Sequence, residues 1–202
     1  MEIMRTIAGD LVAALAKLDP PPDPRFRGPA QEEAIRQAQV ELGVAFDSDL
    51  IEFLMCIDGQ EPEGAADFCW FPGDPIVPMF RFGPDPVQFT AWGWLLGVEQ
   101  IVEHTLRYRD MAEENADEIY ECIGPACFHG DYIQLVSSEN PTSIAIDLRP
   151  LEGGVFGQIV AINDQPNYVV VLAPNLREFL RTIADGYENG RFKYVDGAWS
   201  EP

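Results

Sequence analysis

Apolar residues along the first segment recur at intervals of four, four, four and three residues, at Ile3, Ile7, Leu11, Leu15 and Leu18. This spacing places them on one face of a helix. The proline-rich stretch 19–24 ends the helix, because proline lacks a backbone donor and disfavours helix in the residue before it. We therefore expect residues 1–28 to form a helix and a stiff connector, too short to fold alone.

Two further helices are predicted before residue 60. The first runs from about Pro29 to Leu42 and ends at Gly43, because glycine accepts the left-handed conformation of a helix C-terminus. The second begins after Asp47, whose side chain can cap it, and ends at 58–59. Their inward positions share helical spacing and are Ile35, Ala38, Leu42, Leu50, Phe53, Leu54 and Ile57.

The segment 60–90 is rich in proline, glycine and aromatic residues and shows poor periodicity. We interpret it as a long connection with short strands near 76–82. Its aromatic side chains more plausibly anchor it to the body of the domain than form a ligand site. Residues 91–96 then lead into a helix over 98–118, whose C-terminal part is very acidic.

The last third of the chain has the alternation and turn residues of β-structure. Four strands are predicted, at 132–136, 143–148, 156–162 and 168–172. The links between them are short and turn-forming, so the strands should pair antiparallel as a meander. Pro174 and Asn175 open a final helix with five inward apolar residues, which are Leu176, Phe179, Leu180, Ile183 and Tyr187.

This order of elements predicts one α+β domain over residues 1–202. We expect an antiparallel sheet of about four to six strands, packed by the N-terminal and C-terminal helices. In the second strand of the meander, Ile144, Ile146 and Leu148 share one face, whereas Ala145 and Asp147 share the other.

Charge changes this picture more than any other bulk property. The chain has 13 Lys and Arg against 34 Asp and Glu, a net charge of −21. Two stretches, 37–80 and 110–148, contain no base and nine acids each. Such a field repels nucleic acid and anionic membranes and attracts basic partners. The alternative interpretation is colloidal solubility or a salt-adapted host.

Other sequence features favour a cytoplasmic protein without a metal or cofactor. The chain has no apolar run of roughly eighteen residues that could span a membrane. In a cytosolic protein the four cysteines are expected to be free thiols. Cys122 and Cys127 are too loosely spaced and too isolated for half of a zinc site, which usually has two closely spaced ligand pairs.

Signals of catalysis are weak. The sequence contains no phosphate loop, dinucleotide fingerprint or nucleophile elbow. Of the two histidines, His104 and His129, the second lies in Phe128-His129-Gly130-Asp131, where His129 and Asp131 could bind a metal or serve a hydrolase. We favour a turn before a strand, with Asp131 accepting a backbone hydrogen bond. The glycines at 153, 154 and 157 likewise indicate a hairpin turn rather than an anion-binding nest.

A family resemblance begins in the second and third helices. The residues are Ala34-Ile35-x-x-Ala38-x-x-Glu41-Leu42-Gly43-Val44-x-Phe46-x-x-Asp49-Leu50-Ile51-x-Phe53-Leu54, followed by Asp58-Gly59. They resemble the opening motif of the SUKH superfamily, which includes the fungal Smi/Knr-type regulators of cell-wall assembly and many bacterial immunity proteins. Phe46-Asp47 stands where Leu-Pro is common, and Asp58-Gly59 where Asn-Gly is common. Both departures keep a cap and a turn.

Later blocks resemble the family in the same order. They are 94–101, the paired strands 143–147 and 157–160, and the closing helix 176–180, so the resemblance spans about Gln31 to Tyr187. It implies an α+β fold with no known catalytic residues and a role in binding another protein. In bacteria that role is commonly immunity, the neutralisation of a toxin that is often a nuclease with a basic cleft.

Charge and resemblance together predict a partner-binding surface. We expect it at the acids of the fourth helix and beyond, with a second patch in the long connection and two aromatic residues as apolar anchors. These residues are Glu113, Glu114, Asp117, Glu118 and Glu121, then Glu61, Glu63 and Asp67, then Trp70 and Phe71. For any single acid, a solvated surface is nearly as good an interpretation.

Three functions remain open at this point. The first is an immunity protein that binds a basic, nuclease-type toxin. The second is a housekeeping protein-interaction module of the same fold without a toxin. The third is a hydrolase or metal-binding protein centred on His129 and Asp131. The sequence does not determine the partner, the contact surface or the oligomeric state.

Overall fold

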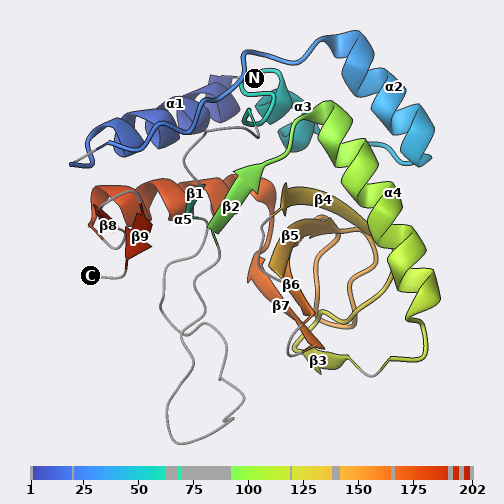
Figure 1. Cartoon of the computed structure of the whole chain (residues 1–202). Helices are drawn as coiled ribbons and strands as arrows, with labels where there is room; N and C mark the ends of the chain where they lie inside the picture. Colours follow the sequence, from blue (N-terminus) through green and yellow to red (C-terminus); the bar gives the residue numbers. More distant parts are fainter. Residues whose placement is uncertain are drawn as a thin grey trace, which may run out of the picture.

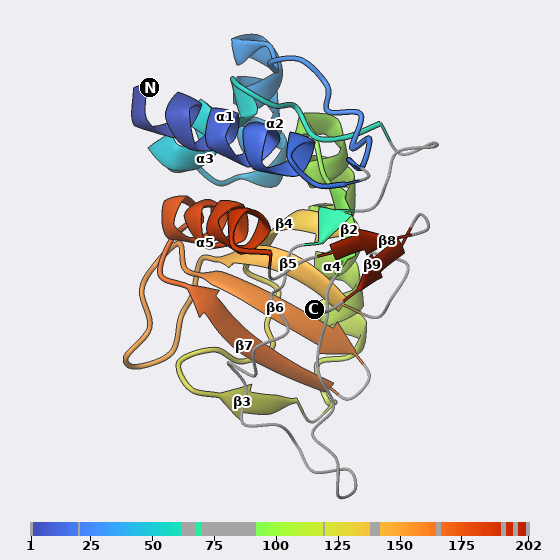
Figure 2. The ribbon, with the colours of Figure 1, turned by 90° about the vertical axis from the view of Figure 1, so that its left-hand side faces the viewer.

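The structure, a computed structural model, describes residues 2–19, 21–61, 68–69, 92–118, 120–137, 142–164, 167–190, 193–195 and 198–200. The described residues form five helices and a twisted sheet, and some of the helices pack on other helices rather than on the sheet (Figures 1 and 2). The helices are α1 (Glu2–Ala16), α2 (Glu32–Leu42), α3 (Ser48–Leu54), α4 (Val98–Glu114) and α5 (Leu176–Glu188). The α+β class predicted from the sequence is confirmed.

A meander of four strands forms the centre of the sheet, as predicted. These are β4 (Tyr132–Ser137), β5 (Thr142–Asp147), β6 (Ile159–Asp164) and β7 (Asn167–Ala173), each antiparallel to the next. β2 (Trp92–Leu95) extends this antiparallel sheet beside β4. Two short edge strands complete the order β1-β2-β4-β5-β6-β7-β3. They are β1 (Phe68–Cys69), antiparallel to β2, and β3 (Glu121–Ile123), parallel to β7. A separate hairpin pairs β8 (Lys193–Val195) with β9 (Ala198–Ser200).

The two faces of the meander contact different apolar clusters. Ile144 and Ile146 join the larger cluster beneath the helices, whereas Ala145 packs on the other face with Tyr108 and Tyr132. α5 lies between α1 and the sheet, and α4 packs against β4 (Figure 2). The alternation predicted for this strand is therefore confirmed, and it divides the core into two layers.

The C-terminus of α2 and the N-termini of α3 and α5 have the expected chemistry, whereas α2 begins at Glu32 rather than Pro29 and α3 ends at Leu54 rather than at 58–59. Asp47 caps α3 by accepting from the Leu50 backbone N–H at 2.7 Å, and Asn175 caps α5 by accepting from Glu178 N–H at 2.9 Å. Gly43 ends α2 with φ of 68°. Each side-chain cap satisfies one of the backbone donors that the first turn of a helix leaves unpaired.

One junction connects the end of α3 to the start of α4. The Asp58 carboxylate accepts from Val98 N–H at 2.8 Å, and the fully buried Gln60 side chain accepts from Leu95 N–H at 2.7 Å. Arg27 donates to the Asp58 carbonyl at 2.6 Å. Gly59 sits between them at φ 73°, so close to the backbone that an added Cβ would lie 2.2 Å from Gly97 N.

Several predicted details are wrong, each for a local reason. On α1 the buried face is set by Met4 rather than Ile3, which is 52% exposed. The acidic helix ends at Glu114, four residues early, and 92–95 is a strand rather than a lead into the helix. The third meander strand begins at Ile159, because 149–158 forms the turn. The predicted strands near 76–82 lie outside the described residues.

The junction yields a direct test. Gly59→Ala should lower the free energy of unfolding by roughly 3 kcal/mol, because it combines a left-handed backbone with overlap against the Gly97 backbone. Gly43→Ala is the matched control: its φ is also positive, but nothing lies within 4 Å of the added Cβ. It should lose only about 1 kcal/mol. Urea unfolding of both variants measures the difference, and equal losses would contradict the proposed close packing.

Candidate functional site

The end of α4 carries an exposed group of carboxylates, here called the acidic face and defined as Glu113, Glu114, Asp117 and Glu118. Glu113 and Glu114 occupy the last turn of the helix, which contains no basic residue. The C-terminal end of a helix carries roughly half a negative charge, so acids there lower helix stability. The acidic face thus lies at a position where its charges lower the stability of α4.

Neither Arg109 nor His104, two basic residues of α4, compensates the charge of the acidic face. Arg109 donates to the Leu42 carbonyl at 2.8 Å, which directs its charge toward α2. Burial lowers the pKa of His104, with opposing effects from the charges of Glu103 and Arg107, so His104 is neutral at pH 7. Glu118 accepts from the Asn167 amide at 3.1 Å, a contact that leaves its charge uncompensated. The face keeps its negative potential.

The other predicted contact residues are only partly placed. Glu121 lies in β3, directly after the acidic face. Glu61 is exposed beside the junction, where its N–H donates to the Arg25 carbonyl. Glu63, Asp67, Trp70 and Phe71 lie outside the described residues. Of the first group, Glu113 and Glu114 lie in the last turn of α4, Asp117 and Glu118 follow in the next described residues, and Glu121 lies in β3.

Cys122 and Cys127 form a disulfide that closes the loop after β3. The prediction of free thiols is wrong for this pair and holds for Cys56. Two cysteines five residues apart can meet across a tight turn, which Gly124 makes possible with φ of 65°. The rarity of disulfides in cytosolic proteins, on which the prediction relied, says nothing about this local geometry.

The turn between β5 and β6 exposes three large apolar side chains that sequence reasoning did not single out. In this segment, here called the apolar loop (residues 149–158), Leu151 is 45% exposed, Val155 54% and Phe156 66%. The predicted hairpin connection is confirmed, but Phe156 was assigned to a strand. The sequence did contain a signal for this exposure. Val155 and Phe156 directly follow a glycine pair, and consecutive apolar residues in a short turn cannot all point toward the protein core.

Buried polar side chains hold the apolar loop in place. The Gln158 side chain accepts from Val155 N–H at 3.1 Å and donates to the Pro125 carbonyl at 3.2 Å and to Asp147 Oδ2 at 2.9 Å. Asp147 is fully buried and also accepts from Arg149 N–H at 2.8 Å. These bonds fix both ends of the loop, so its apolar side chains are presented without a large ordering cost.

His129 packs against the same network. Its Nε2 lies 3.1 Å from Asp147 Oδ1, although the angle is poor for a hydrogen bond, and its Nδ1 accepts from Asp131 N–H at 3.0 Å. The ring stacks on Tyr132 at 4.1 Å. The predicted turn is confirmed, but its acceptor is His129: the Asp131 carboxylate instead pairs with Arg149 at 3.1 Å.

The structure gives His129 and Asp131 different hydrogen-bond and ion-pair partners. In the part of the chain that the structure describes, no serine, threonine or cysteine side chain bonds to His129, and no three candidate metal-ligand side chains cluster. Burial, and then the charge of Asp147, raises the pKa of Tyr132 far above the usual tyrosine range. Its protonated hydroxyl donates to the Cys127 carbonyl at 2.7 Å. His129 and Asp131 point to different partners.

Comparison with known protein families completes the description. The model of the SMI1 / KNR4 family (SUKH-1) matches residues 29–182, more than half of the chain. The chain belongs to the SMI1 / KNR4 family (SUKH-1). No curated protein matches it. In addition, no helix among the described residues is long and apolar enough to cross a bilayer.

The SUKH-1 match contains the junction, the acidic face and the apolar loop. It begins after α1 and stops within α5. The structure also explains the residues that suggested the family: Asp47 caps α3, while Asp58 and Gly59 connect α3 to α4. These three residues thus have structural roles, and the candidate binding surfaces lie at other, exposed residues.

The buried amide of Gln158 can be tested by its removal. Gln158→Ala should leave one Asp147 oxygen and Val155 N–H without partners, which lowers stability by about 1–3 kcal/mol. Amide hydrogen exchange at Val155 should become faster. The control is Gln31→Ala, an exposed residue that makes no side-chain cap bond. Unchanged exchange at Val155 would show that Gln158 does not hold the loop.

Proposed function

We propose that this SUKH-1 protein is a non-catalytic binding domain that neutralises a basic toxin of the nuclease class. The observation that carries the proposal is the acidic face at the C-terminal end of α4. A sequence shaped by stability alone favours bases in this position, because they complement the helix dipole. Acids there have a cost in stability that partner binding would explain.

The acidic face would act mainly on the rate and selectivity of association. A basic substrate cleft is attracted over several ångströms by a field of this sign, and the effect falls as salt rises. An acidic protein in such a cleft also competes with nucleic acid for the same positive charges. Neutralisation would therefore need no chemical step.

The apolar loop supplies what charge alone does not, an anchor that slows dissociation. Interfaces are dominated by a few large side chains that fill pockets on the partner, and aromatic residues are frequent among them. Phe156 is 66% exposed on a loop that Gln158 and Asp147 hold in place. We propose Phe156 in the role that the sequence suggested for Trp70 and Phe71.

One partner could reach both surfaces. Leu151 N–H and the Gln158 amide bond to the Pro125 carbonyl, so the apolar loop is attached to the segment that follows β3. Seven residues separate Pro125 from Glu118, and an extended chain of that length spans at most about 25 Å. A protein interface of ordinary size, about 800 Å² on each partner, is that wide.

We propose that the protein works in the cytoplasm, where a nuclease toxin would act. Disulfides in that compartment are rare because cellular thiols reduce them. The Cys122–Cys127 bond would then open, and the proposed binding surfaces do not include it. The network around His129 has a supporting role in this proposal, because its polar atoms hold the apolar loop.

The charge contribution can be tested with any toxin-like protein that a neighbouring gene encodes. Neutralising the acidic face (E113Q/E114Q/D117N/E118Q) should slow association at least tenfold at low salt and flatten its salt dependence. The same change should raise the stability of the domain by a few tenths of a kcal/mol or more, since it removes acids from the negative end of α4. Stopped-flow binding and urea unfolding measure the two effects.

A control variant removes the same charge elsewhere, on α2 and the first turns of α4, through E32Q, E41Q, E99Q and E103Q. It should bind much more like the unmodified protein. Equal slowing by both variants would mean that net charge, rather than the acidic face, drives association. A gene without a toxin-like neighbour would favour the housekeeping interaction module instead.

The anchor role of Phe156 has a separate test. Phe156→Ala should increase the dissociation rate at least tenfold, with little change in association or in folding stability, because the side chain is mostly exposed. Val40→Ala is the matched control: Val40 is 78% exposed on α2, away from the loop. Surface plasmon resonance against the same toxin measures both. If the Phe156→Ala complex dissociates at the unmodified rate, the anchor lies elsewhere.

A further inference from the structure

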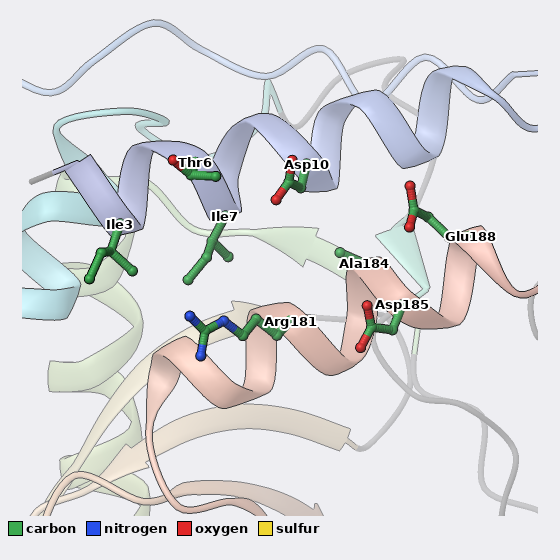
Figure 3. Close-up of a pocket in the computed structure, with 8 residues that line it drawn as sticks. All are labelled: Ile3, Thr6, Ile7, Asp10, Arg181, Ala184, Asp185 and Glu188. Atoms are coloured by element: carbon green, nitrogen blue, oxygen red, sulfur yellow. The ribbon is translucent and has the colours of Figure 1, made fainter.

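A groove of about 560 Å³ runs between α1 and α5 (Figure 3). α1 contributes Ile3, Thr6, Ile7 and Asp10, and α5 contributes Arg181, Ala184, Asp185 and Glu188. In Figure 3, Ile3 and Arg181 occupy one end, whereas Asp10, Asp185 and Glu188 gather toward the other. One end of the groove thus combines an apolar side chain with the Arg181 guanidinium, which pairs with Glu178, and the other end is acidic.

The charges along the groove are not balanced. Arg181 donates to Glu178 at 2.8 Å, and Glu188 pairs with Lys17 at 2.7 Å. Within the described part of the chain, the Asp10 and Asp185 carboxylates form no ion pair or hydrogen bond. These two carboxylates, on facing helices, therefore lie without a basic partner in the same groove.

The apolar part of the groove is open to a ligand. Ile3 is 52% exposed although it points toward α5, the buried Ile7 follows it along α1, and the buried Ala184 lines the groove nearer Asp185. An exposed isoleucine next to a cavity offers a surface for methylene groups. An ammonium ion alone would gain little from it, because it is compact and strongly hydrated.

We propose that the groove binds an arginine side chain of a protein partner. The three methylenes would lie against Ile3 and Ile7, and the planar guanidinium would donate to both Asp10 and Asp185. The proposal rests on the protein-binding function only in taking the arginine to be a partner's. It is independent of the acidic face, because the groove is built from other elements.

The groove is a feature of this chain rather than of the matched family region. All of its lining residues except Arg181 lie outside residues 29–182. α1 nevertheless belongs to the folded domain, since Met4, Leu11 and Leu15 are buried in the larger core cluster. The proposed recognition site therefore depends on α1, which lies outside the matched region.

The test uses small probes and the full chain, so it does not require the toxin. N-acetyl-arginine amide, titrated into isotope-labelled protein, should shift the backbone amide signals of α1 and α5. N-acetyl-citrulline amide, the neutral analogue, should shift none of them, and N-acetyl-lysine amide should bind more weakly. Asp10→Asn and Asp185→Asn should each weaken arginine binding about threefold, and the double variant should abolish the shifts.

Two controls separate the groove from general electrostatics. Glu41→Gln removes one exposed charge on α2 and should leave binding unchanged. Ile3→Ser should weaken binding of the arginine probe without affecting that of free guanidinium ion. Equal shifts with citrulline, or full binding by the double variant, would overturn the proposal. If the toxin is still bound while the probe is not, the groove is wrong and the proposed function stands.

Discussion

The contact between Gly59 and the backbone of Gly97 determines where everything else in this fold can lie. A Cβ at Gly59 would be 2.2 Å from Gly97 N, so the end of α3 can approach the start of α4 only with glycine at this position. Asp58 then caps α4 through Val98, and Gln60 bonds to β2. This junction positions the start of α4, and packing against β4 sets the direction of its axis. Together the two contacts place the acidic end of the helix.

Local chemistry explains which features could be predicted from the sequence. Asp47 and Gly43 act through their own backbone neighbours, so the helix ends they define were predicted correctly. Ile3 was misassigned because periodicity predicts which face of the helix is apolar but not which residues at the margin of that face are buried. That depends on where α5 lies. Phe156 was misassigned because a turn and a strand can share the same apolar residues when nothing tertiary is known. The Cys122–Cys127 bond depends on a turn, which composition does not report.

The acidic face also could be predicted as a charge run, but its meaning depends on the structure. A run over 113–118 within one long helix would be a solvated face with little energetic consequence. Since α4 ends at Glu114, the acids instead surround a helix C-terminus whose dipole has the same sign. Salt or a basic partner would relieve the repulsion between these acids and the helix dipole. The repulsion that lowers the folding stability of the free protein therefore favours association with a basic partner.

The distance between the buried side chains of His129 and Asp147 has to be considered together with the hydrogen bonds that each already makes. A histidine 3.1 Å from a buried carboxylate has the spacing of a hydrolase dyad. Here, however, His129 Nδ1 already accepts from the Asp131 backbone, and Asp147 accepts from Gln158 and Arg149. Every one of these bonds ends on the apolar loop or on the turn beside it. Asp147 and His129 Nδ1 therefore help to fix the apolar loop that the proposed function uses, whereas the buried His129 Nε2 has no hydrogen-bond partner among the described residues.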